Sequence, residues 1–207
     1  MKLWIDFYDL AAPDVPGCPD AMLNAALRQA AIDFCEQSLA WSYDHPAISV
    51  VAATSAYPFV PPAQAIVHAI TYAKFIDTEI EVEISEDNLR IWNWRAQAGT
   101  PQYALANPTS VRLVPTPDLP GTLTLIVALK PSPTATGVDD AMFNEYREAI
   151  IHGAKARLML SPKKPYTDAQ LAQYHQQQFT IKTGRAGTRH ARNYTREALR
   201  TSILRRW

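Results

Sequence analysis

The chain has 207 residues, of which 47% are hydrophobic and 10% aromatic, so it can bury a core and is not an intrinsically disordered protein. Its 20 basic and 20 acidic side chains give a formal net charge of zero. No apolar run approaches the roughly 20 residues that a membrane-spanning helix needs, and the two cysteines are too few for a disulfide framework. We therefore expect a protein without membrane partners or disulfide bonds.

The zero net charge hides a division of the chain into an acidic part and a basic part. Residues 181–207 contain eight basic side chains against one acidic side chain, Glu197, and therefore carry +7. Residues 1–180 consequently carry −7. A compact neutral enzyme has no need of such asymmetry, which favours a protein with an interaction surface.

The first strong secondary-structure pattern follows a proline-rich stretch at 16–19. Leu23, Leu27 and Phe34 recur at helical spacing, and they predict an amphipathic helix over residues 19–39.

The middle of the chain has the composition of β-strands, with β-branched and aromatic runs separated by proline-rich turns. The predicted strands cover 48–51, 66–72, 79–84, 111–114 and 122–130. A short helix is predicted to begin at Ser85 and to reach Trp92 or Trp94. Sixteen prolines against seven glycines indicate stiff connections and edge strands.

Two further helices are predicted, over residues 139–161 and from Thr167 to about Lys182, where Gly184 and Gly187 are expected to end the second one. The predicted fold class is α+β, with a three-helix bundle, an inserted antiparallel β-sheet or sandwich subdomain and an extended basic C-terminal arm. The predicted segments are 1–46 (N-terminal segment and first bundle helix), 47–131 (β subdomain), 132–182 (second and third bundle helices) and 183–207 (the arm).

Motifs of known chemistry are missing from the sequence. It contains no dinucleotide-binding, phosphate-loop, zinc-protease or nucleophile-elbow motif, and its five histidines are scattered. We predict no catalytic residue, no cofactor and no metal. A small hydrolase stays open only as an alternative in which the fold brings a histidine together with Cys18 or an acid.

Glu79, Glu81 and Glu83 alternate with apolar residues in one predicted strand, which gives that strand an acidic face. The simplest interpretation is a solvated face. The alternative is a surface that repels another polyanion or docks a basic partner.

The arginines near the C-terminus recur every three or four residues, so a helix would place them on one side. A solvated terminus and a nucleic-acid-binding segment are both possible interpretations. The apolar anchors among the arginines favour a groove on a protein instead. The candidate binding residues are Arg185, Arg189, Arg192, Tyr194, Arg196, Arg200, Ile203, Leu204, Arg205, Arg206 and Trp207.

Several stretches together resemble the head-to-tail adaptor proteins of short-tailed bacteriophages, the tail-tubular-A-like group. They are PGCPDA (16–21), AAIDFCE (30–36), RLVPTP (112–117), VALKPS (127–132) and YREAIIHGAKARL (146–158). The resemblance extends over residues 15–180.

This resemblance implies a structural virion protein that assembles in the host cytoplasm and resides at the head–tail junction. Twelve copies would form a ring between the portal protein and a tail-tubular-B-like nozzle protein, with double-stranded DNA passing through the channel. The resemblance also implies that the arm docks on the portal, and that Glu79, Glu81 and Glu83 face the channel or a neighbouring subunit.

Overall fold

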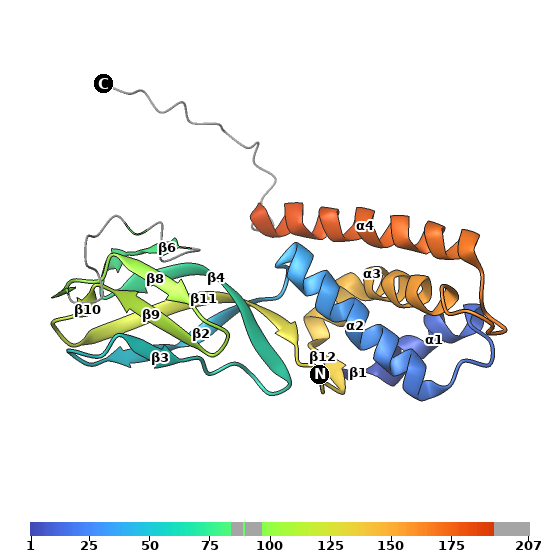
Figure 1. Ribbon diagram of the computed structural model, residues 1–207, viewed down its shortest axis with the longest axis horizontal. Coiled ribbons are helices and arrows are strands. Elements are labelled where there is room, and N and C mark those ends of the chain that lie inside the picture. The colour runs from blue at the N-terminus through green and yellow to red at the C-terminus, as the bar shows by residue number, and fades with distance from the viewer. Residues whose placement is uncertain (84–88, 90–96, 193–207) are drawn as a thin grey trace, which may run out of the picture.

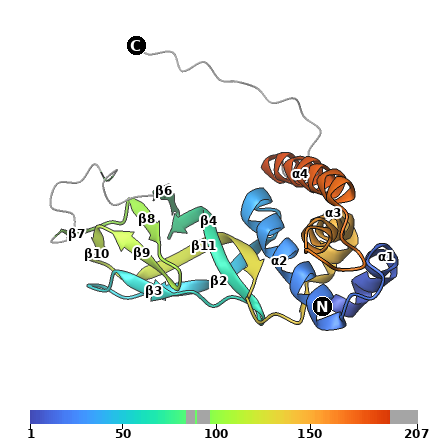
Figure 2. The same ribbon diagram turned by 45° about the vertical axis from the view of Figure 1, so that its right-hand side comes forward.

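The computed structural model describes residues 1–83, 89 and 97–192, and its elements form a helical part and a β part that lie beside each other (Figure 1). A view turned by 45° shows the same separation (Figure 2). In the described part of the chain, four α-helices and several sheets with mainly antiparallel strand pairs confirm the predicted α+β class. Within the residues that are described, no helix is long and apolar enough to cross a membrane.

Three long helices pack against one another in the helical part: α2 (Asp20–Ser38), α3 (Asp140–Met159) and α4 (Ala169–Ala191). Their apolar stripes form one core because each stripe faces the other two helices. The largest side chains of this core include Leu23, Leu27, Phe34, Ile150, Met159 and Phe179.

Gly153 of α3 faces both α2 and α4. A Cβ atom at this position would lie 2.8 Å from the Phe179 ring of α4 and 3.0 Å from the Ala30 Cβ of α2. A larger residue would therefore push the helices apart, and glycine permits their close contact.

Polar side chains and backbone turns define the helix ends. Asp139 and Asp168 cap the N-termini of α3 and α4, accepting hydrogen bonds from Ala141 N and Gln170 N, both at 2.9 Å. Leu39 ends α2 in the left-handed conformation, with φ of 53°.

Helix α4 continues well beyond Lys182, so the predicted end at Gly184 and Gly187 is wrong. A glycine inside a helix costs only about 1 kcal/mol relative to alanine, and tertiary packing readily offsets that amount. Thr183 and Ala186 are buried against the bundle, which keeps the last turns of α4 in place.

The N-terminal segment packs against α2 and α3. Its elements are β1 (Lys2–Leu3), the 3-10 helix η1 (Trp4–Phe7), α1 (Tyr8–Ala11) and the 3-10 helix η2 (Ala12–Asp14). β1 pairs with β12 (Gly137–Val138), and the buried Trp4 indole donates a hydrogen bond to Ala135 O at 2.8 Å. A Cβ at Gly137 would lie 2.0 Å from Lys2 O, so this pairing requires glycine.

Two four-stranded sheets build most of the β part, between α2 and α3 in the chain. The first has the order β2 (Ser42–Val50), β11 (Gly121–Pro131), β4 (Ala65–Phe75), β5 (Thr78–Glu79). The second has the order β3 (Ala56–Pro58), β9 (Ser110–Val114), β8 (Tyr103–Ala106), β6 (Glu81–Glu83). Their buried side chains share a second core, which includes Phe75, Leu113, Leu123 and Leu125.

The prediction of one continuous strand over 79–84 is wrong. The chain leaves the first sheet after Glu79, and Ile80 N donates a hydrogen bond to Ala73 O at 3.0 Å. Glu81 N donates to Gln102 O at 2.9 Å, and β6 then joins the second sheet. Periodicity of two fits both halves, so it cannot reveal a change of partner.

Two strand pairs depart from the predicted antiparallel arrangement. β6 runs parallel to β8, and the short strands β7 (Ala98–Gly99) and β10 (Thr116–Pro117) are also parallel. The short helix predicted after Ser85 lies outside the described residues, except for Leu89.

Candidate interaction surfaces

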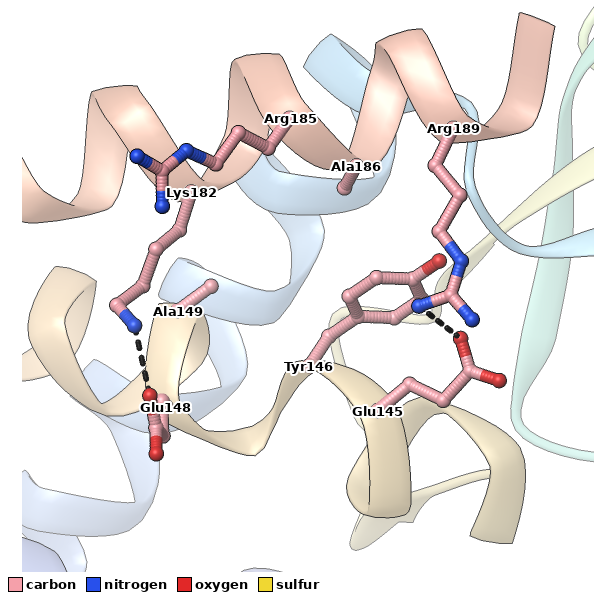
Figure 3. Close-up of a pocket in the computed structure, with 8 residues that line it drawn as sticks. All are labelled: Glu145, Tyr146, Glu148, Ala149, Lys182, Arg185, Ala186 and Arg189. Carbon is pink, nitrogen blue, oxygen red and sulfur yellow. Dashed lines mark hydrogen bonds and ion pairs between the residues drawn. The ribbon is translucent and has the colours of Figure 1, made fainter. Parts of the chain in front are cut away.

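The C-terminal half of α4 concentrates basic side chains above α3. Lys182, Arg185 and Arg189 follow one another at spacings of three and four, so they share one side of the helix. Together with Glu145 and Glu148 of α3 they surround a shallow pocket of about 210 Å³ (Figure 3).

Two of these basic side chains are compensated by α3. Lys182 Nζ lies 2.6 Å from Glu148 Oε2, and Arg189 Nη1 lies 3.4 Å from Glu145 Oε2 (Figure 3). The hydrogen bond and positive charge of Lys182 lower the pKa of Glu148, which therefore stays ionised at neutral pH. Arg185 is exposed and makes no ion pair with any described residue.

The structure divides the segment predicted as an arm. Residues 183–191 are the last turns of α4, and Arg192 is the C-cap of that helix. Arg185 and Arg189 therefore have a defined position on the bundle. The other candidates lie outside the described residues: Tyr194, Arg196, Arg200, Ile203, Leu204, Arg205, Arg206 and Trp207.

The predicted acidic face spans the place where the chain changes sheets. Glu79 and Glu81 are exposed, and with Thr71 and Tyr72 they line a pocket of about 470 Å³. Glu83 is the last residue of β6, and its side chain lies outside the described part. Glu79 and Glu81 are therefore close to each other, although they belong to strands of different sheets.

A histidine pair joins α3 to α4, and sequence inspection missed it. The Nδ1 atoms of His152 and His175 lie 2.8 Å apart, so one ring donates a hydrogen bond to the other. Burial and the nearby charge of His175 lower the pKa of His152 to about 4, and burial also lowers that of His175. Both rings are therefore mainly neutral at pH 7, so one Nδ1 can donate its proton to the unprotonated Nδ1 of the other ring. No local spacing signal could have found a pair separated by 23 residues.

An ion pair anchors the N-terminal segment to α3. Lys155 of α3 is buried, and its Nζ lies 2.6 Å from Asp14 Oδ2. This contact supplies the charge partner that a buried ammonium needs.

The surroundings of the two cysteines differ from those of a catalytic nucleophile. Burial in the bundle core raises the pKa of the Cys35 thiol, which keeps it protonated. Cys18 is half-buried, and its sulfur donates a weak hydrogen bond to Pro19 O at 3.7 Å. Within the described part of the chain, no three histidine, cysteine or acidic side chains are arranged to hold a metal ion.

Comparison with known protein families gives a match that spans both parts of the fold. The family model described as SU10 adaptor protein matches residues 4–202. A search among curated proteins found no match.

Proposed function

The chain belongs to the SU10 adaptor protein family, and on that basis we propose that twelve copies form a ring between the portal and the tail nozzle of a short-tailed phage. Membership makes it a phage adaptor, so its role in the virion is structural and not catalytic. The observation that carries the proposal is the family match over 4–202, which covers the bundle and the sheets. The finer assignment to the tail-tubular-A-like group rests on the sequence resemblance.

In this proposal the C-terminal end of the chain docks on the portal. Arg185 supplies a charge on α4 that no described residue compensates, and Arg189 and Arg192 continue the basic side toward residues 193–207. That final segment adds four arginines together with Ile203, Leu204 and Trp207. Trp207 and the arginines suit a protein groove, because aromatic residues and arginine are enriched at the centres of protein interfaces.

In this proposal the acidic face of Glu79, Glu81 and Glu83 faces either the DNA channel or a neighbouring subunit. Glu79 and Glu81 are exposed and have no ion-pair partner among the described residues. A carboxylate lining repels phosphates and lets double-stranded DNA pass without being held. The tail nozzle, a tail-tubular-B-like protein, binds the ring on the side away from the portal.

Mixing the chain with the portal protein of its phage tests this function. A variant that ends at Arg192 keeps α4 complete, so its unfolding temperature should equal that of the full chain. The full chain should form a complex of ring stoichiometry with the portal, measured by native mass spectrometry. The shortened variant should bind at least about tenfold more weakly, which corresponds to about 1.4 kcal/mol.

A charge variant elsewhere provides the control. Lys163→Glu with Lys164→Glu alters two exposed basic residues in the connection between α3 and α4, and it should leave portal binding unchanged. Absence of any complex between the full chain and the portal would refute the adaptor position. Equal affinity of the shortened variant would refute only the C-terminal docking site.

Nucleic-acid binding is the second candidate function, and the arginine-rich C-terminus is the observation that favours it. Pairing of Lys182 and Arg189 with α3 weakens this candidate, since those charges are already compensated. A nucleic-acid-binding protein would bind bare duplex DNA with an affinity that falls steeply with salt. An adaptor should bind its portal far more tightly than DNA at physiological salt.

A further inference from the structure

Helix α4 exposes three large apolar side chains along one flank. Leu171, Tyr174 and Ile181 are 47%, 51% and 46% exposed. Their spacing places them within one side of the helix, and Arg185 continues that side toward the C-terminus. The residues that face the bundle are a different set, namely Ala172, His175, Phe179, Thr183 and Ala186. We call Leu171, Tyr174, Ile181 and Arg185 the α4 stripe.

A second exposed apolar group lies on the N-terminal segment. Leu3 and Ile5 are 47% and 62% exposed, and they border a pocket of about 290 Å³ that also involves α2. Asp6 and Asp9 are exposed on the same short segment. We call Leu3, Ile5, Asp6 and Asp9 the N-terminal patch.

The two surfaces complement each other in both character and charge. Each presents apolar side chains that are about half exposed, and the basic Arg185 of one surface matches the acidic Asp6 and Asp9 of the other. Arg185 makes no ion pair within its own chain, among the residues described, so its charge remains available to a neighbour. Apolar surface framed by opposite charges is typical of a specific protein contact.

The positions of the two surfaces match those of a head-to-tail contact. α4 runs along one edge of the helical part, and β1 with the chain's N-terminus lies at the opposite edge in both views (Figures 1 and 2). A contact between two different surfaces on opposite sides of a subunit forms a ring when the rotation closes. If two α4 stripes bound each other, both stripes would be used up and assembly would stop at a dimer. In such an antiparallel pair the charged Arg185 of one copy would face the apolar Leu171 of the other.

We infer that the α4 stripe of one copy binds the N-terminal patch of the next copy. The ring itself rests on the proposed function, and the inference identifies the surfaces that close it. Tyr174 and Ile181 contact Leu3 and Ile5 of the neighbour, while Arg185 pairs with an acidic side chain of the neighbour's patch.

Two complementary defective variants test this contact. Variant one carries Leu171→Glu and Ile181→Glu, and variant two carries Leu3→Glu and Ile5→Glu. The control carries Gln173→Glu and Gln177→Glu, which add the same charge to the other flank of α4. Measured unfolding temperatures establish that all three variants are folded. Analytical ultracentrifugation at protein concentrations up to about 1 mM detects self-association with a Kd as weak as about 1 mM.

The expected result is self-association of the wild type and the control, and at least about tenfold weaker association of each defective variant. An equimolar mixture of the two defective variants should form dimers and nothing larger, because it restores one contact and leaves the outer surfaces defective.

Other outcomes overturn the inference. Dimers of variant two alone would show contact between two α4 stripes, and a wild type that is monomeric at about 1 mM would show that the surfaces do not bind. If the monomeric wild type still formed a ring on the portal, the proposed function would stand and this interface would be wrong. If it neither self-associated nor bound the portal, both would fail.

Discussion

The histidine pair between α3 and α4 predicts that the bundle loses stability in mild acid. The two Nδ1 atoms lie 2.8 Å apart, so the hydrogen bond exists only while one of them lacks a proton. Lys155 and Lys182 add positive charge around His152, and Glu148 and Asp14 offset that charge only in part. Protonation of both rings would place two donors and two like charges in contact.

The sign and size of the effect follow from the pKa of His152, which falls from 6.5 to about 4 on folding. Because the unfolded chain binds the proton more readily, the pair stabilises the fold fully above pH 6.5. That stability is lost as the pH falls from 6.5 toward 4. A shift of this size corresponds to at most about 3 kcal/mol, and solvent screening of the half-buried ring reduces it to roughly 1–2 kcal/mol.

Thermal unfolding between pH 7 and pH 4 measures this loss. For a chain of this length we expect the pair to lower the unfolding temperature by roughly 2–8 °C over that range. The double variant with His152→Asn and His175→Asn keeps polar groups at the Nδ1 positions and should show a shallower dependence on pH. His190→Gln changes a histidine of α4 outside the pair and should keep the wild-type dependence. An unchanged pH dependence in the double variant would refute this reasoning.

Glycine positions and the acidic face give two further predictions. Gly153→Ala places a methyl group 2.8 Å from the buried Phe179 ring, so overpacking of about 1–3 kcal/mol should exceed the gain of about 1 kcal/mol in helix propensity. A methyl group at position 184 meets open space, so Gly184→Ala should raise the free energy of unfolding by up to about 1 kcal/mol. Denaturant unfolding measures the change in this free energy for both variants. Changes of the same sign would contradict the packing argument. Glu79→Lys with Glu81→Lys should impair ring assembly on the portal or DNA ejection. If both processes kept their wild-type yield, the acidic face would have no role in either.

Much of the secondary structure could be predicted because its signals are local. Apolar residues at helical spacing located α2 within one residue at each end, and the start of α3 was located equally well. The strand predicted over 122–130 corresponds to β11, which is one residue longer at each end. The strand predicted at 48–51 begins earlier, at Ser42, because Pro46 interrupts the pattern but is tolerated in β2 at the edge of its sheet.

The candidate sites were less accessible to sequence inspection. The basic spacing at Arg185 and Arg189 was visible, but their assignment to a separate arm ignored that buried Thr183 and Ala186 hold this stretch in α4. A helix end depends on what its last turns touch, which local sequence does not record. Tyr194 and the candidates after it remain predictions.

The sequence by itself determined the fold class, the order of the helices and main strands, and the contrast between an acidic body and a basic C-terminus. These properties depend on composition and on periodicities of a few residues, which any short window displays. Tertiary structure alone decided the change of sheet at Ile80, the contact of His152 with His175 and the pairing of Lys155 with Asp14. Each of these features depends on groups that the fold brings together, and the two groups lie between seven and 141 residues apart in the sequence. Each also depends on burial, which makes an unpaired polar group costly.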